Sequence, residues 1–151
     1  MKILILLPPK AQKRARHAVI GGRAVAYKDK GQRLEEHKLG MLLYDHRPAK
    51  PYEGAVFLSL IAYLALPKSK PKWWKRAALA GEILPIVKPD LDNLVKHLKD
   101  CMTGIFYLDD KQVVQQQARK AYGETACWEI VIYTIGKQPP SDFEVHGEST
   151  Y

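Results

Sequence analysis

The run from Ala55 to Leu66 constrains the fold of this chain more than any other segment, because it is almost wholly apolar. It is rich in the β-branched and aromatic side chains that suit strands. A short apolar run of this kind predicts a central strand that is buried on both faces of a sheet. Neighbouring elements must therefore cover it, and the rest of the pattern has to supply them.

The helix that we predict over Asp90 to Met102 has the clearest pattern in the chain. Its apolar residues recur at i, i+3, i+4 and i+7 and form one stripe, which contains Leu91, Leu94, Val95, Leu98, Cys101 and Met102. Pro89 precedes the helix, Asp90 is suited to its N-cap, and Gly104 is suited to end it.

Weaker patterns predict the other elements. They are a strand over Ile3 to Leu7, a hairpin over His17 to Val25 that turns at Gly21-Gly22, a helix over Asp29 to Tyr44, a short helix over Lys72 to Ala80, and strands over Val113 to Tyr122 and Ala126 to Ile135. This order predicts an α+β fold, with a mixed or antiparallel sheet packed by two to three helices. We expect residues 1–136 to form one small domain and residues 137–151 to form a polar, frayed C-terminal tail.

The charge of the chain favours a polyanionic partner. Its 151 residues include 24 Lys and Arg against 16 Asp and Glu, which gives a formal net charge of +8. The excess is concentrated between Lys10 and Lys38 and between Lys68 and Lys88, whereas the tail after Gly136 is acidic. Nucleic acid is the leading candidate partner for such a chain.

Several settings and chemistries are disfavoured. Two cysteines cannot make a disulfide framework, and the apolar start at Ile3 to Leu7 is too short for a secretion signal or a membrane span. We therefore expect a reduced, cytoplasmic protein with no membrane partner. The chain has no glycine-rich phosphate loop, no zinc-ligand spacing and no recognisable nucleophile setting.

Four aspartates fall in two short stretches. Asp90 and Asp92 stand at the predicted helix start, and Asp109 and Asp110 stand in the turn before the next strand. A helix start and an adjacent returning strand start can lie side by side, so we expect these carboxylates to meet. Clustered carboxylates favour protonation or a bound cation. Ligand sets made only of oxygen select hard ions, so Mg²⁺ is expected, with Mn²⁺ as a substitute.

A hard cation on a basic protein suits phosphodiester hydrolysis. The metal polarises the phosphoryl group, lowers the pKa of a bound water and offsets charge on the leaving oxygen. Lys96, one turn after Asp92, could stabilise the pentacovalent phosphorane or orient the scissile phosphate.

Structural roles compete with this interpretation, and spacing alone favours them. Asp90 and Asp92 can cap the helix, and Asp92 with Lys96 makes an ordinary i,i+4 pair. Asp109-Asp110 can be plain turn chemistry. Trp73 and Trp74 can stack on unpaired bases or, more commonly, pack on the domain. The hairpin is either a phosphate-gripping finger or a solvated surface element.

The motif itself carries a resemblance. Lys88-Pro89-Asp90-Leu91-Asp92-Asn93-Leu94 through Lys96, then Asp100, then Tyr107-Leu108-Asp109-Asp110-Lys111-Gln112-Val113, resembles the RusA family of Holliday junction resolvases, which occur mostly in phages and prophages. Pro8-Pro9-Lys10, Pro67-Lys68-Ser69, Lys120-Ala121-Tyr122-Gly123 and the segment from Trp128 to Ile135 resemble further parts of that family. The resemblance covers roughly residues 2–136.

This resemblance implies a homodimer that cleaves four-way DNA junctions by paired, Mg²⁺-dependent nicks during recombination and repair. It places the catalytic residues at Asp90, Asp92, Asp110 and Lys96, the metal ligands at Asp90, Asp92, Asp109 and Asp110, and a supporting residue at Asn93. The connection from Cys101 to Leu108 is one residue shorter than in the best-known family member, which leaves the choice between Asp109 and Asp110 open. Trp73-Trp74 and the extension after Gly136 have no counterpart in the family.

The expected DNA-binding residues are all basic. They are Lys10, Lys13, Arg14, Arg16, Arg23, Lys68, Lys70, Lys72, Lys75, Arg76, Lys88 and Lys120. Two other functions stay open on the sequence. The first is a non-catalytic module that binds branched DNA and uses its aspartates only as caps. The second is a small metal-binding regulator or interaction protein whose basic face binds a protein.

Overall fold

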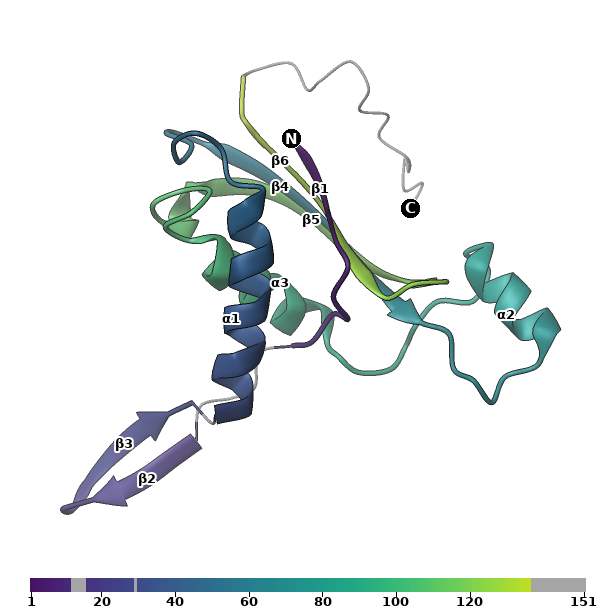
Figure 1. Cartoon of the computed structure of the whole chain (residues 1–151), viewed down its shortest axis with the longest axis horizontal. Helices are drawn as coiled ribbons and strands as arrows, with labels where there is room; N and C mark the ends of the chain where they lie inside the picture. The colour runs from purple at the N-terminus through teal and green to yellow at the C-terminus, as the bar shows by residue number, and fades with distance from the viewer. Residues whose placement is uncertain (12–15, 29, 137–151) are drawn as a thin grey trace.

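The strand β4 (Val56–Ala65) lies at the centre of a four-stranded mixed sheet of order β1-β6-β4-β5 (Figure 1). The computed structural model describes residues 1–11, 16–28 and 30–136. β4 pairs in parallel with β5 (Val113–Gly123) and antiparallel with β6 (Cys127–Thr134). β1 (Lys2–Ile5) pairs antiparallel with β6 and forms one edge of the sheet. The predicted α+β fold is confirmed, and its sheet is mixed.

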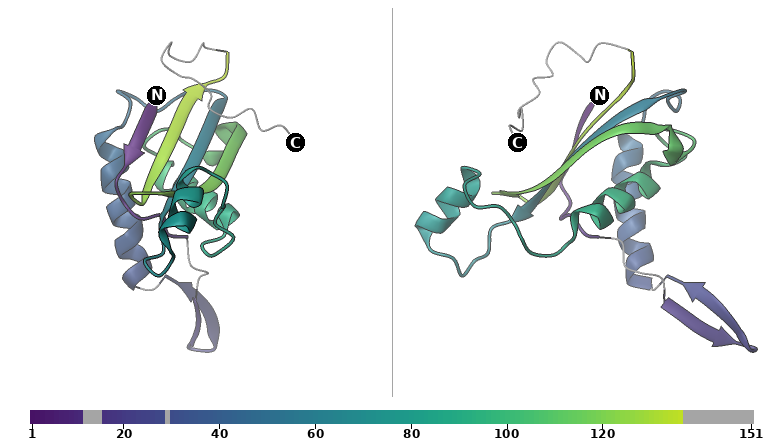
Figure 2. Two further views of the ribbon diagram at one scale, coloured as in Figure 1. Left: turned by 90° about the vertical axis from the view of Figure 1, so that its right-hand side faces the viewer. Right: turned by 180° about the vertical axis from the view of Figure 1, so that it is seen from behind.

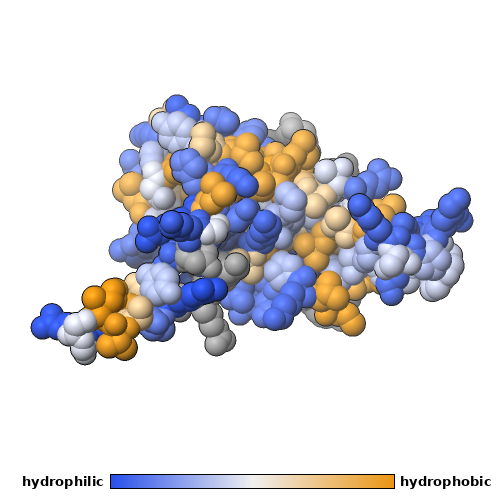
Figure 3. Space-filling view, turned by 60° about the horizontal axis from the view of Figure 1, so that its bottom comes forward, coloured by the Kyte–Doolittle hydropathy of each residue, from blue (hydrophilic) through white to orange (hydrophobic). Residues whose placement is uncertain are grey.

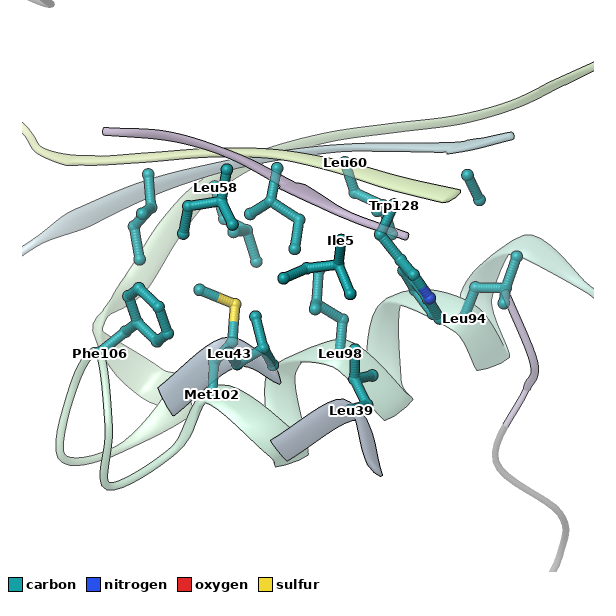
Figure 4. Packing of buried hydrophobic residues seen from close by; sticks show 14 of the residues in the cluster. Ile5, Leu39, Leu43, Leu58, Leu60, Leu94, Leu98, Met102, Phe106 and Trp128 are labelled. Atoms are coloured by element: carbon teal, nitrogen blue, oxygen red, sulfur yellow. The ribbon is translucent and has the colours of Figure 1, made fainter. Parts of the chain in front are cut away.

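Two helices cover one face of this sheet (Figure 2). They are α1 (Lys30–Asp45) and α3 (Leu91–Met102). The core lies between the helices and the sheet, and Figure 4 shows its side chains. Among its members are Ile5, Leu39, Leu43, Leu58, Leu60, Leu94, Leu98, Met102, Phe106 and Trp128. The apolar stripe predicted for α3 is confirmed, because Leu94, Leu98 and Met102 are fully buried.

The prediction that β4 is buried on both faces is wrong for its second half. Leu58, Leu60 and Ala62 point into the core, whereas Ser59, Ile61 and Tyr63 are only half-buried on the opposite face. At the start of the strand, Phe57 is covered by the stacked ring of Tyr133, with 4.8 Å between the ring centroids. The sheet therefore has its helices on one face, and apolar composition alone did not reveal the second, more open face.

The parallel pairing of β4 with β5 requires a long crossover connection. This connection contains α2 (Lys72–Leu79), which projects from one end of the sheet, and α3, which returns along the core (Figure 1). A 3₁₀ turn, η1 (Asp110–Gln112), leads into β5. Asp90 stands at the N-cap position of α3, as predicted.

The predicted hairpin is also confirmed. Its strands β2 (Arg16–Ile20) and β3 (Arg23–Tyr27) form a separate two-stranded sheet that projects beyond one end of α1 (Figure 1). Gly21 and Gly22 have φ values of 58° and 77°, which is why the tight turn needs two glycines. Nearly every side chain of the hairpin is exposed.

Two expectations concern other parts of the chain. The tail predicted at residues 137–151, and the DNA-binding candidates Lys13 and Arg14, lie outside the described residues. Over the described ranges, the helices are all too short or too polar to cross a bilayer.

Candidate functional site

The N-terminal end of α3 presents two carboxylates to which the described residues supply no hydrogen bond or ion pair. Asp90 has the extended backbone of an N-cap residue, with φ −70° and ψ 140°, but its side chain makes no capping hydrogen bond. Asp92 is exposed in the first turn, and no ion pair joins it to Lys96 within residues 30–136. The positive end of the helix dipole favours negative charge here. Neither the capping hydrogen bond of Asp90 nor the ion pair between Asp92 and Lys96, both weighed above, is therefore formed.

The backbone before Asp90 is held by a side chain from the sheet. The Nζ atom of Lys120, on β5, donates hydrogen bonds to the carbonyl oxygens of Val87 at 2.6 Å and Pro89 at 3.0 Å. The ammonium group of Lys120, expected to contact DNA, is thus engaged in positioning the segment that leads to Asp90. The peptide bond between Lys88 and Pro89 is cis.

Asp90 lines a surface hollow with a volume of about 610 Å³. The hollow is bounded by the start of α3, the start of α1 and the segment after β1. Its lining includes Pro9, Lys10, Gln32, Glu35, Lys88, Asp90, Asn93 and His97. Four of the predicted catalytic, supporting and DNA-binding residues therefore line one space: Lys10, Lys88, Asp90 and Asn93. Lys10 also pairs with Glu35 at 3.1 Å, and this hydrogen bond lowers the pKa of the Glu35 carboxyl.

His97 is a residue of this hollow that sequence reasoning missed. Its side chain is 3% exposed, and its Nδ1 atom has no hydrogen-bond partner among the described residues. Burial lowers the pKa of its imidazole, which favours the neutral form. The available signal was its position one turn after Asn93, since residues four apart share a helix face.

The turn at Asp109-Asp110 is a different kind of structure, because its side chains hold the backbone. Asp109 Oδ1 accepts a hydrogen bond from the Lys111 amide at 2.9 Å. Gln112 Oε1 in turn accepts from the Asp109 amide at 3.1 Å, so the two residues form a reciprocal capping box. The hydrogen bond from the Lys111 amide lowers the pKa of Asp109. The turn chemistry weighed for Asp109 is confirmed.

This turn is also anchored to a distant part of the chain. The Nε2 atom of Gln112 donates to the carbonyl oxygens of Tyr52 at 2.9 Å and Gly54 at 3.1 Å. Tyr107 is fully buried, and its hydroxyl donates to the carbonyl of Lys99 at 3.0 Å, near the C-terminal end of α3. Asp110 therefore begins η1 beside the end of α3 and not beside its start.

The prediction that the two aspartate pairs meet within one chain is wrong. The twelve residues of α3 separate the pairs, and a helix of this length spans about 17 Å. Lys120, which bonds to Pro89, lies seven residues along β5 from Val113, or about 23 Å for a strand. Within residues 1–11, 16–28 and 30–136, no three His, Cys, Asp or Glu side chains gather closely enough to hold a metal ion. The reason is topological: β5 begins where α3 ends and runs back past the start of α3.

Most of the expected DNA-binding side chains lie on two projections. Arg16 and Arg23 are exposed on the hairpin, and Lys68, Lys70, Lys72 and Arg76 are exposed on and before α2. Lys75 is half-buried, and its Nζ atom donates to the carbonyl of Lys68 at 3.3 Å. In the space-filling view, hydrophilic atoms cover the α2 projection, while the hairpin also carries apolar atoms (Figure 3).

The two adjacent tryptophans, Trp73 and Trp74, lie in different surroundings. Trp74 packs edge-on against Tyr122, with 5.3 Å between the ring centroids, and the Nζ atom of Lys70 lies 5.2 Å from its ring centre. Trp73 is 66% exposed. Packing on the domain therefore accounts for Trp74 and leaves Trp73 in solvent.

Comparison with known proteins agrees with the motif. Residues 7–133 match the family model described as endodeoxyribonuclease RusA. The chain is 31% identical over 137 residues to the uncharacterized protein YqaN of Bacillus subtilis (strain 168), covering 89% of this chain and 96% of that protein. It is 30% identical over 118 residues to the crossover junction endodeoxyribonuclease rusA of Lactococcus phage r1t, covering 77% and 82%.

The chain thus combines an α+β fold, a mixed sheet and two carboxylates at a helix start with a match to a nuclease family over most of its length. The chain belongs to the RusA family of endodeoxyribonucleases.

Proposed function

We propose that this protein is a homodimeric, Mg²⁺-dependent endonuclease that resolves four-way DNA junctions in recombination and repair, in the bacterial cytoplasm. The observation that carries the proposal is the pair of carboxylates at the start of α3, which have no hydrogen-bond or ion-pair partner among the described residues and lie within the stretch that matches the RusA family. The relative from Lactococcus phage r1t, named a crossover junction endonuclease, supports the choice of substrate.

The donor set at the start of α3 fits a hard cation. Asp90 and Asp92 offer carboxylate oxygens and Asn93 offers an amide oxygen, while Mg²⁺ takes one or two carboxylates and fills its other positions with water and phosphate oxygens. A bound Mg²⁺ would polarise the scissile phosphate and lower the pKa of an attacking water. Lys96, exposed on the same helix, would place its ammonium group against the phosphate.

The third catalytic aspartate that the resemblance implies, Asp110, lies at the far end of α3 from Asp90 in the same chain. It cannot reach the Asp90 site of its own chain. We infer that Asp110 of the partner subunit completes the site of Asp90 and Asp92. In a two-fold dimer such a contact is reciprocal, so it creates two equivalent sites at once. Two sites related by a two-fold axis suit the paired nicks that resolve a nearly two-fold junction.

The two basic projections would hold the DNA backbone. Lysine and arginine side chains that neutralise phosphates release counterions, so affinity for the junction should fall steeply with salt. Lys68, Lys70, Lys72 and Arg76 belong to the α2 projection, and Arg16 and Arg23 to the hairpin.

The testing experiment is the cleavage of a synthetic four-way junction beside a linear duplex of matched sequence. Both strands are labelled, and the reactions contain Mg²⁺, Mn²⁺ or EDTA. We expect paired nicks on the junction only, dependent on the metal and lost in Asp90→Asn. Junction binding without cleavage under any metal would replace the proposal with a branched-DNA-binding module.

A further inference from the structure

A second hollow adjoins the one that contains Asp90. Its volume is about 620 Å³, and it lies between α2 and the ends of β4 and β5. The two hollows share Pro9 and Lys88 as a common wall. The side chains that line the second one include Leu64, Lys70, Trp74, Ile83, Ile86 and Tyr122. A single segment, Ile83 to Asp90, thus runs from the second hollow to the candidate catalytic carboxylate.

The chemistry of the second hollow is aromatic and apolar inside and basic at its rim. Trp74 and Tyr122 supply the aromatic surface, and Lys70 and Lys88 supply the charge. The apolar loop beside it is unusually open, since Leu84 is 58% exposed, Ile86 96% and Val87 55%. Lys120 holds this loop against the sheet through the Val87 carbonyl, so the apolar surface is fixed in place.

We propose that this hollow binds one unstacked nucleobase of the DNA, next to the phosphodiester bond that is cleaved at Asp90. The proposal rests on the proposed function. Aromatic side chains interleaved with lysines bind unpaired nucleotides by stacking on the base and pairing with the phosphate. Turning a base outward costs least where the duplex is already disturbed, and the exchange point of a four-way junction is where its strands leave one duplex for another. The shared wall lets a base and its neighbouring phosphate occupy the two hollows together.

Charge favours DNA over a second copy of this chain as the occupant. Among the residues that the structure describes, none that lines the hollow is acidic, and the adjacent α2 projection carries Lys68, Lys72 and Arg76. A second copy of the same basic segment would bring like charges together, whereas a nucleotide brings a compensating phosphate. The hollow therefore provides sequence preference for cleavage, because its walls contact a base and not only the backbone.

The test uses a panel of junctions in which the bases flanking the cleaved bond are varied. Each is also made with 2-aminopurine, a fluorescent base, at the flanking position. Trp74→Leu removes the stacking surface, and Ile86→Gln changes a fully exposed side chain that has no role in folding. Trp73→Leu is the matched control, since Trp73 is exposed and does not line the hollow.

We expect wild-type protein and Trp73→Leu to quench 2-aminopurine and to prefer one flanking base. Trp74→Leu and Ile86→Gln should lose the quenching, and their preference between bases should fall about tenfold, toward equal cleavage. Wild-type preference in both variants would overturn the proposal. A second result would also overturn it: an Ile86→Gln variant that sediments as a monomer and cleaves all sequences equally poorly. That result would mean that a second copy of the chain, and not a base, occupies the hollow.

Fluorescence separates this proposal from the nuclease proposal. It is measured in EDTA as well as in Mg²⁺, so capture of the base is observed without cleavage. If the wild-type protein quenches 2-aminopurine but never cleaves, the proposed base site stands and the proposed nuclease activity is wrong. If the protein cleaves but quenches 2-aminopurine at no flanking position, the nuclease proposal stands and the base-site proposal is wrong.

Discussion

The two ends of α3 carry the same residue type in opposite circumstances. At the C-terminal end, Asp109 is engaged by the Lys111 amide and supported by Gln112, whose side chain is tied to Tyr52 and Gly54. At the N-terminal end, Asp90 occupies a cap position without making the cap. The carboxylate of Asp90 is therefore left available for the proposed ligand, whereas that of Asp109 already accepts a hydrogen bond. The comparison also favours Asp110 over Asp109 as the second catalytic position.

The largest expected effect comes from removing the charge of the unengaged carboxylate. Asp90→Asn should lower cleavage of the junction by at least about a hundredfold, because the change removes a proposed metal ligand. Binding should survive or tighten, since a negative charge near the phosphate is gone. The measurement is single-turnover cleavage together with a gel-shift titration.

Asp109→Asn is the matched control for this change. An asparagine side chain can still accept the Lys111 amide, so the turn should persist and cleavage should stay within a few-fold of wild type. If Asp109→Asn abolished cleavage while Asp110→Asn did not, the assignment of the two residues drawn from this comparison would be reversed.

The second prediction tests whether the two ends of α3 work together across a dimer. Asp90→Asn and Asp110→Asn proteins should each be inactive alone. When mixed and allowed to exchange subunits, a mixed dimer has one site carrying both substitutions and one site carrying neither. We therefore expect single nicks to reappear at about a quarter of the wild-type rate, without paired cleavage, because random exchange makes about half of the dimers mixed and each of these has one intact site of two. No recovery, in a mixture shown by tagged subunits to exchange, would place all the acids of a site in one chain.

Lys120 connects the sheet to the Asp90 end and gives the third prediction. Lys120→Met removes two hydrogen bonds to the Val87 and Pro89 carbonyls, so Asp90 loses its fixed position. We expect about a tenfold slower reaction at low Mg²⁺ that high Mg²⁺ partly restores, because each lost bond costs about 1 kcal/mol. Lys72→Met is the control: it lies on the α2 projection and should weaken binding without changing the Mg²⁺ dependence. Equal behaviour of the two variants would make Lys120 a phosphate contact.

The fourth prediction concerns the stability of the opposite end. Gln112→Ala leaves the Tyr52 and Gly54 carbonyls without their donor and opens the capping box, so it should lower the free energy of unfolding by about 1–3 kcal/mol. Gln116→Ala, on an exposed position of β5, should change it by less than about 0.5 kcal/mol. Urea denaturation measures both. A negligible effect of Gln112→Ala would mean that the turn is not held as tightly as the comparison requires.

The sequence predicted the elements well and their spatial relations poorly. The stripe of α3 and the apolar run of β4 are local patterns, so their positions followed directly. The distance between Asp90 and Asp110 depends on β5 pairing in parallel with β4, which no local pattern encodes. The role of Gln112 depends on Tyr52, which is 60 residues away in the chain. The failed cap at Asp90 is a side-chain choice that only the folded surroundings reveal.

The smallest effect concerns His97, near the Asp90 end of α3. Its side chain is buried, and its Nδ1 atom has no hydrogen-bond partner among the described residues. Because burial lowers its pKa in the folded state, the unfolded chain binds more protons below about pH 6.5. Stability should therefore be unaffected at neutral pH and should fall as the pH decreases from about 6.5, by at most about 1.4 kcal/mol per pH unit. His97→Gln should remove that part of the acid dependence, while His46→Gln at an exposed position should leave it unchanged. Urea titrations at pH 7.5, 6.0 and 5.0 measure the difference, and identical slopes in all three proteins would show that His97 is protonated as readily in the folded state as in the unfolded chain.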